Sequence, residues 1–144
     1  MQLVDLDRYQ QQHKSDLPPK LKKLVPELNK YFERALERSQ DAAPRADIVP
    51  VTLAKKLSID EALALALLMI SENAGVVTPK YHVLCPETGS FLGEFKSIED
   101  LPDSIHCPYH ESGEKEHGVD DYDVDLVFRF TPRVLRKYVR ANKG

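Results

Sequence analysis

Two cysteines and two histidines stand in related local sequences, and both side-chain types bind transition metals. Cys85 and Cys107 are each followed by a proline, and His110 stands three positions after Cys107. A further histidine, His117, follows His110 after six intervening residues. Thiolates and imidazoles are the ligands that zinc prefers, and four of them close a tetrahedral structural site. We therefore predict a zinc site made by Cys85, Cys107, His110 and His117.

The segments that contain the two cysteines resemble the Cys-Pro-x-Cys-Gly turn of a zinc ribbon. The first reads Cys-Pro-Glu-Thr-Gly from Cys85, so Thr88 stands where the turn has its second ligand. The second reads Cys-Pro-Tyr-His from Cys107, so His110 replaces that ligand. His82 and His106 are alternative ligands, although His82 alternates with apolar neighbours, which is typical of a histidine on a sheet face.

The same residues also permit an interpretation without metal. Both cysteines would then be small buried side chains, and His110 and His117 would be solvated among neighbouring glutamates. A disulfide between the cysteines is disfavoured, because we expect a cytoplasmic protein.

An enzymatic interpretation needs a nucleophile with a base, or a metal with an open position. Cys107 would be the nucleophile with His110 or His117 as the base, or a zinc ion would act with Glu111 or Glu114 as the base. No third group that orients such a pair is identifiable, and no H-E-x-x-H, G-x-S-x-G or glycine-rich phosphate loop occurs in the sequence. We therefore predict that the protein is not an enzyme.

The elements that position these residues are helices first and short strands later. After a proline-marked boundary at residues 17–19, apolar spacing of three and four from residue 21 to 36 predicts a helix, and Pro26 should bend it or mark a restart near Val25. Residues 52–57 and 60–73 predict a helix-turn-helix, with Ser58 and Glu61 as a capping box and Gly75 as the stop. We expect a short helix before residue 17 and a surface loop over 41–50.

The second half of the chain predicts a small antiparallel sheet. Residues 80–84 and 90–95 read as a hairpin, 97–101 as a short helical turn and 106–121 as a polar stretch without strands. Alternation over 122–130 predicts a strand that buries one face, from Tyr122 through Val124 to Phe130, and a helix follows from 132 to 141. The fold class is therefore α+β.

This order of elements resembles a winged helix-turn-helix domain with a zinc-ribbon-like insertion in its wing. The resemblance covers about residues 50–130 and implies a DNA-binding or protein-bridging module. It predicts an N-terminal helical segment over 1–49 and a winged-helix-like domain over 50–144, with the insertion at about 81–121.

Charge is distributed unevenly along the chain and bears on the partner. Residues 81–125 hold two basic and twelve acidic side chains, whereas residues 126–144 hold six basic side chains and no acidic one. The second helix of the helix-turn-helix has no basic residue, which disfavours reading of the DNA major groove. We predict a non-enzymatic adaptor that binds a protein partner. The alternative is a DNA-binding transcriptional regulator that uses basic terminal helices, and a zinc-dependent hydrolase is the third hypothesis. The predicted contact residues for a nucleic acid or another partner are Lys20, Lys22, Lys23, Lys55, Lys56, Arg133, Arg136, Lys137 and Arg140.

Length and hydropathy set the remaining expectations. With 144 residues, 42% hydrophobic and 30% charged, the chain fits one ordinary globular domain. Its longest apolar run, residues 62–70, is shorter than the roughly 20 residues that a membrane span needs. The acidic first ten residues do not read as a secretory signal. We expect a cytoplasmic protein without a membrane segment.

Overall fold

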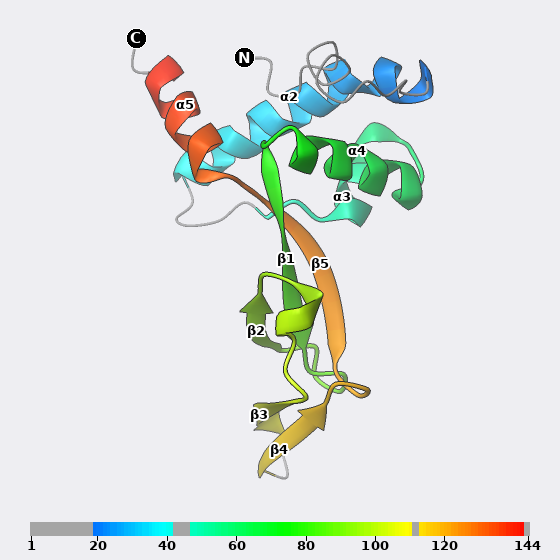
Figure 1. Ribbon diagram of the computed structural model, residues 1–144, viewed down its shortest axis with the longest axis vertical. Coiled ribbons are helices and arrows are strands. Elements are labelled where there is room, and N and C mark those ends of the chain that lie inside the picture. The colour runs from blue at the N-terminus through cyan, green and yellow to red at the C-terminus, as the bar shows by residue number, and fades with distance from the viewer. Residues whose placement is uncertain (1–18, 42–46, 111–112, 143–144) are drawn as a thin grey trace. The chain divides into compact units, whose positions relative to one another are not determined.

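The computed structural model describes residues 19–41, 47–110 and 113–142, and has an α+β fold (Figure 1). Its helices are α2 (Pro19–Asp41), α3 (Pro50–Leu57), α4 (Glu61–Asn73) and α5 (Pro132–Asn142), with a 3-10 turn η1 (Ile98–Asp100). Its strands are β1 (Val77–Leu84), β2 (Phe91–Phe95), β3 (Ser104–His110), β4 (Gly113–Gly118) and β5 (Asp123–Phe130). The expected helix before residue 17 lies outside the described residues.

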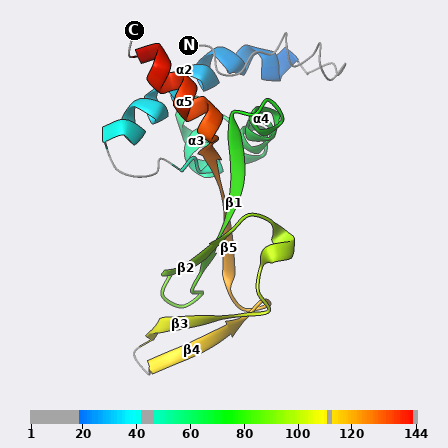
Figure 2. The ribbon, with the colours of Figure 1, turned by 60° about the vertical axis from the view of Figure 1, so that its left-hand side comes forward.

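The chain divides into two compact units. The first combines residues 1–78 with 128–144, and the second is formed by residues 79–127. Figure 2 shows the helices that belong to the first unit and the short strands of the second. In the described part of the chain, no helix is both long enough and apolar enough to cross a membrane. The boundary expected at residue 50 is not tested by this division and stays a prediction.

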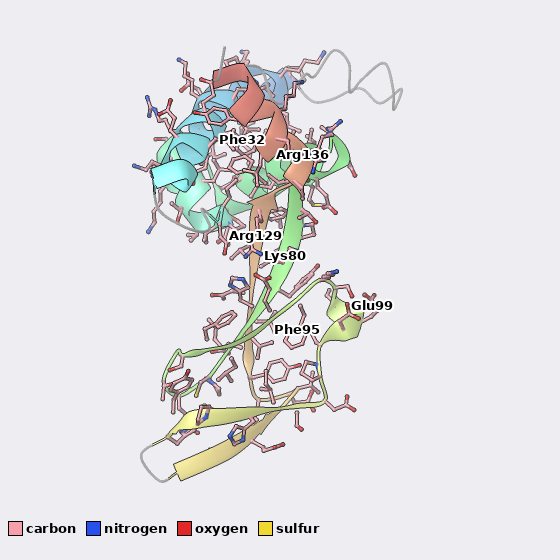
Figure 3. All side chains as sticks on the ribbon, turned by 90° about the vertical axis from the view of Figure 1, so that its left-hand side faces the viewer. Phe32, Lys80, Phe95, Glu99, Arg129 and Arg136 are labelled. Atoms are coloured by element: carbon pink, nitrogen blue, oxygen red, sulfur yellow. The ribbon has the colours of Figure 1, made fainter. Side chains whose placement is uncertain are left out.

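The first unit is built on the apolar face of α2, which packs with α3 and α4. Leu28, Phe32 and Leu36 are completely buried on that face, and the ring of Phe32 meets that of Phe130 edge to face at 5.6 Å. Figure 3 shows Phe32 in the interior of this unit and Arg136 on the outside of α5. The helix continues through Pro26, so the expected restart near Val25 does not occur.

The segment after α2 differs from the expected surface loop. Ile48 is 1% exposed and pairs with Phe128 through two backbone hydrogen bonds of 2.7 and 2.8 Å. The side chain of Asp47 accepts hydrogen bonds from Arg129 on the neighbouring strand. The sequence indicated a loop because a single buried isoleucine among proline and charged residues produces no apolar periodicity.

The turn between α3 and α4 is capped by a residue other than the one expected. Asp60 is the N-cap of α4, and its carboxylate accepts a hydrogen bond of 2.7 Å from the amide of Leu63. Ser58 instead ends α3 in the left-handed conformation, with φ 55°. The predicted capping box of Ser58 and Glu61 is therefore wrong, because α4 begins at Glu61 and the carboxylate of Asp60 already reaches the first turn.

The end of α4 is fixed by the start of α5. Gly75, the predicted stop, has φ 77° and its carbonyl oxygen accepts a hydrogen bond of 2.9 Å from the hydroxyl of Thr131. The guanidinium of Arg133 also donates to the carbonyl of Ala74 at 3.2 Å. A side chain at position 75 would meet that guanidinium at 2.7 Å, in a backbone conformation that favours glycine.

The second unit contains two antiparallel sheets. One has the order β2-β1-β5, and β3 and β4 form the other. The expected hairpin of β1 and β2 is present, with Tyr81 opposite Phe95. The polar stretch over 106–121 is not a loop, because β3 and β4 pair from Ser104 opposite Gly118 to His110 opposite Gly113.

The expected face of β5 is only partly correct. Phe128 and Phe130 are buried as predicted, and so is Tyr122 just before the strand. Val124, however, is 41% exposed and Val127, on the opposite face, is buried. The first three residues of the strand are exposed, and its second half has buried residues on both faces, which a single alternating pattern cannot indicate.

The assignment of the α4 cap can be tested by unfolding in denaturant. Replacing Asp60 with alanine removes the acceptor for the Leu63 amide and should lower the free energy of unfolding by about 1 kcal/mol. Ser58→Gly should leave the free energy of unfolding unchanged or raise it, because glycine adopts the left-handed conformation without the cost of a side chain. The opposite result, a lower free energy of unfolding in Ser58→Gly and an unaltered one in Asp60→Ala, would support the capping box of Ser58 and Glu61.

Candidate metal centre

All four predicted ligands converge in the second unit. The ligand atoms of Cys85, Cys107, His110 and His117 lie within 4.8 Å of one another. The Cys85 sulfur is 3.5 Å from Nε2 of His110 and 3.5 Å from Nε2 of His117. The two Nε2 atoms are 2.9 Å apart. Three segments that are distant in the sequence therefore meet at one point.

Cys85 is positioned by the turn between β1 and β2. The Cys85 amide donates to the carbonyl of Ser90 at 2.8 Å, and the amide of Gly89 donates back to the carbonyl of Cys85 at 2.8 Å. The turn also directs the Thr88 amide at the Cys85 sulfur, at 3.4 Å. Gly89 has φ 74°, the left-handed conformation that lets the turn close. Thr88 occupies the position of the missing ligand, and it contributes a hydrogen bond from its backbone amide to the Cys85 sulfur.

A bulge in β3 brings Cys107 and His110 to the same side. Cys107 pairs with Lys115 and His110 with Gly113, so β3 has one extra residue between these pairs. Side chains three positions apart in a regular strand point to opposite faces, and one extra residue cancels that difference. His117 of β4 pairs with Ile105, two positions before Cys107, and so shares its face.

The centre is enclosed by the protein. Cys85, Cys107 and His117 have no exposed surface, and the side chain of His110 is 5% exposed. Four buried ligand groups leave no side of the cluster open to solvent, which is the arrangement of a structural metal site.

Each histidine of the cluster is oriented by a carboxylate. Nδ1 of His117 lies 2.8 Å from an oxygen of Asp121, and Nδ1 of His110 lies 3.1 Å from an oxygen of Glu87. An ionised carboxylate can only accept, so Nδ1 of each ring donates to its carboxylate and Nε2 of each ring is directed at the cluster. Lys115 fixes Glu87 in turn through an ion pair of 2.6 Å.

The two Nε2 atoms, 2.9 Å apart, are close enough either to share one proton as a hydrogen bond or to bind the same metal ion. A metal ion bound by both Nε2 atoms and by the two sulfurs would satisfy all four groups at once. Histidine ligands that donate their other nitrogen to a carboxylate are the usual arrangement around zinc.

The distances agree with a tetrahedral zinc site. Zinc binds sulfur at about 2.3 Å and imidazole nitrogen at about 2.0 Å, so a sulfur and a nitrogen ligand lie about 3.5 Å apart and two nitrogens about 3.3 Å apart. The two sulfur–nitrogen distances fit this value. The two nitrogens, at 2.9 Å, need to separate by a few tenths of an ångström. The cluster is thus able to hold a metal ion and is compatible with zinc.

The electrostatics of the two thiols differ. Burial raises the pKa of Cys85, but hydrogen bonds from Thr88 and from the backbone of Glu87 outweigh it and lower the pKa to about 6. Burial raises the pKa of Cys107, and the neighbouring Cys85 raises it further. The lowered pKa favours the thiolate of Cys85, which is the form that binds metal.

The other predicted residues lie apart from this centre. His82 lies on β1, where Nε2 contacts Glu94 at 2.9 Å, and His106 is exposed on the opposite face of β3 from Cys107. Glu111 lies outside the described residues, and nothing is described of the side chain of Glu114. Glu87 and Asp121, which orient the histidines, were not singled out in the sequence.

The predicted basic contact residues belong to the first unit. The lysines at 20, 22 and 23 are exposed on α2 and those at 55 and 56 on α3, whereas Arg133, Arg136 and Lys137 are exposed on α5. Nothing is described of the side chain of Arg140. Among the described residues, no hydrogen bond or ion pair joins these side chains into one site.

No family model matches the chain, and comparisons with curated proteins and with solved structures find no significant match. The chemistry of the protein therefore has to be argued from its own residues.

The metal site predicts one zinc ion per chain. Cys107→Ser and His117→Ala should each abolish zinc binding, measured by elemental analysis of protein purified without chelator. The matched control is His106→Ala, which removes an imidazole from the other face of the same strand and should retain the zinc. Equal zinc content in His117→Ala and in the control would contradict the ligand assignment.

The two carboxylates predict a graded effect. Asp121→Asn weakens the acceptor for Nδ1 of His117 and should reduce zinc affinity by about 10-fold to 100-fold in competition with a chelator. Asp120→Asn changes an exposed carboxylate at the adjacent position and should leave zinc affinity unaltered. An equal loss of zinc affinity in both variants would show a general effect of negative charge and would contradict the role of Asp121 in orienting His117.

Proposed function

We propose that this protein is a non-enzymatic interaction module in which a structural zinc ion holds the unit formed by residues 79–127. One observation carries the proposal. In the described part of that unit the buried residues are Val83, Cys85, Cys107, His117, Tyr122 and Val127, and half of them are proposed ligands.

This small number of buried apolar side chains explains why the unit needs a metal. Short domains bury too little apolar surface to offset the conformational entropy of the chain, and a structural metal supplies the missing free energy. A catalytic zinc instead keeps one coordination position for water. The enclosure of four ligands thus supports the structural role over that of a zinc-dependent hydrolase.

The order of the elements supports a winged-helix interpretation. The helices α3 and α4 pack together, the hairpin of β1 and β2 follows, and β5 returns beside β1. In this interpretation the Ile48–Phe128 bridge is a short additional strand before the helix-turn-helix. In the sequence, the four proposed ligands lie between β1 and β5, where a winged helix has its wing. We propose that the turns around these ligands form a zinc knuckle within the wing.

The surface of α4 favours a protein partner over DNA. Its exposed residues are Glu61, Ala62, Met69, Glu72 and Asn73, which include two carboxylates and no cation. A recognition helix needs Arg, Lys, Asn or Gln directed at base edges and no negative charge near phosphates. The acidic segment 81–125 is complementary to a basic protein surface. We therefore propose an adaptor whose protein partner is basic, acting in the cytoplasm.

The alternative of a DNA-binding transcriptional regulator rests on the exposed cations of α2, α3 and α5. It requires that affinity for duplex DNA falls steeply with salt and falls further in Arg136→Ala. Binding of that kind, or co-purified nucleic acid that survives moderate salt, would contradict the adaptor proposal. Hydrolysis of a substrate that is abolished by His117→Ala but not by His106→Ala would contradict the non-enzymatic role.

The structural role of zinc predicts a local response to its removal. A chelator should make residues 79–127 sensitive to limited proteolysis, with the cut sites identified by mass spectrometry. The helical signal in circular dichroism should persist, because α2 to α5 all belong to the other unit. Unchanged cleavage after complete removal of zinc would contradict a structural role.

A further inference from the structure

A second candidate site lies in the helical unit, between α2 and α3. A cavity of about 350 Å³ is lined there by charged residues, a tyrosine and a leucine. The size is in the range of pockets for small ligands. Its lining residues are Glu27, Lys30, Tyr31, Arg34, Glu37, Arg38, Lys56 and Leu57.

The helical period of α2 brings most of these residues to one face. Positions 27, 30, 31, 34, 37 and 38 recur at intervals of three and four, which is the spacing of one helix face. The buried residues Leu28, Phe32 and Leu36 occupy the face that packs in the core. The cavity thus lies between the polar face of α2 and the last turn of α3.

The charge of the cavity is positive. Four cations and two carboxylates line it, which gives a formal charge of +2. Lys30 and Glu27 neutralise each other in an ion pair of 3.4 Å. The other three cations, Arg34, Arg38 and Lys56, line the same cavity and form no ion pair with a carboxylate of the described residues.

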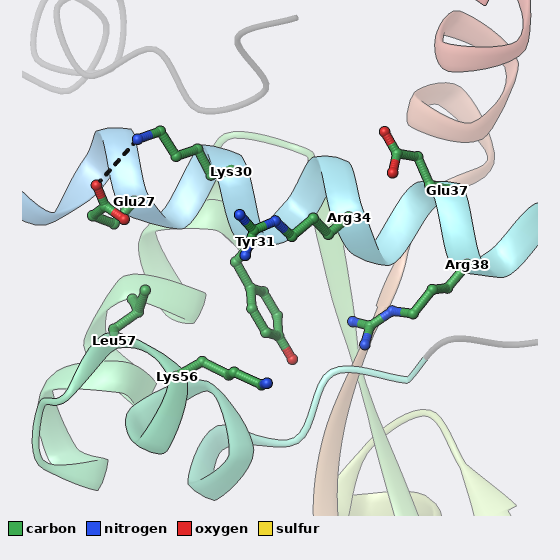
Figure 4. Close-up of a pocket in the computed structure, with 8 residues that line it drawn as sticks. All are labelled: Glu27, Lys30, Tyr31, Arg34, Glu37, Arg38, Lys56 and Leu57. Carbon is green, nitrogen blue, oxygen red and sulfur yellow. Dashed lines mark hydrogen bonds and ion pairs between the residues drawn. The ribbon is translucent and has the colours of Figure 1, made fainter.

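The side chains converge around the hydroxyl of Tyr31. Figure 4 shows the ring of Tyr31 extending from α2 towards α3, with the Lys56 ammonium and the Arg38 guanidinium on either side of that space. The Glu37 carboxylate points to the other side of α2 in the same view. Tyr31 is half-buried; burial raises the pKa of its hydroxyl, and the nearby Arg38 guanidinium opposes that shift. Hydrogen-bond donors at one end and an aromatic ring along one side are thus both present.

We propose that this cavity binds the phosphate of a small phosphomonoester. A phosphomonoester carries close to two negative charges at neutral pH, which matches the cavity. Arginine recognises phosphate through paired hydrogen bonds, and lysine adds a point charge. The organic group of the ligand lies against the ring of Tyr31 and Leu57. This site is independent of the metal centre, which lies in the other unit.

The test is calorimetric titration of the zinc-loaded full chain with phenyl phosphate, inorganic phosphate and benzoate. Phenyl phosphate should bind at one site per chain, more tightly than inorganic phosphate, which lacks the ring, and than benzoate, which has one charge. Arg38→Gln and Lys56→Gln should each weaken phenyl phosphate binding by about tenfold, the usual effect of losing a charged hydrogen bond.

The control is Lys22→Gln, which removes an exposed cation of the same helix outside the cavity and should leave the affinity unchanged. The melting temperature of each variant shows that the helical unit remains folded. No saturable binding of phenyl phosphate, or equal affinity in Arg38→Gln and in Lys22→Gln, would overturn the proposal. A single-stranded oligonucleotide without terminal phosphates that binds more tightly than phenyl phosphate, and loses affinity in Arg38→Gln, would overturn it in favour of nucleic-acid phosphodiesters.

Discussion

The convergence of four buried ligand groups is the constraint on which the second unit depends. Two histidine rings and two thiols are held in contact by the chain, and the carboxylates of Glu87 and Asp121 direct Nε2 of both rings inwards. Buried polar groups need partners, and these four have mainly one another. A metal ion would bind all four at once, and in the proposed function metal binding and folding of this unit are coupled.

This constraint explains several local features that otherwise look unrelated. The bulge in β3 exists where Cys107 and His110 have to share a face, and the left-handed Gly89 closes the turn that presents Cys85. The ion pair of Lys115 with Glu87 holds a carboxylate that would otherwise be a mobile surface group. Each feature contributes to the geometry at the metal rather than to an apolar core.

The helical unit has a different basis. Its core is a conventional set of apolar side chains on α2, α3 and α4, closed by Phe128 and Phe130 from β5. The polar face of α2 is then available for binding, and the cations at positions 34, 38 and 56 line the proposed phosphate site. In the proposed function, the helical unit is stabilised by burial of apolar surface and the other unit by coordination of a metal.

Sequence patterns predicted α2 well because three- and four-residue spacing is repeated over several turns, and they predicted the start of α5 because proline favours the first turn of a helix. The convergence of the four proposed ligands was also predictable, since both cysteines precede a proline and histidines follow the second one. The strands β3 and β4 were missed because their sequence has no apolar alternation. Glu87 and Asp121 could not be found from spacing, because one lies in a turn and the other follows a strand, and no period links them to the rings.

X-ray absorption spectroscopy at the zinc edge of the full chain tests the central claim most directly. The account predicts a shell of two sulfur atoms at about 2.3 Å and two imidazole nitrogens at about 2.0 Å, with no bound water. A shell dominated by oxygen, or three protein ligands with a water molecule, would contradict the structural site. It would instead favour the hypothesis of a zinc-dependent hydrolase.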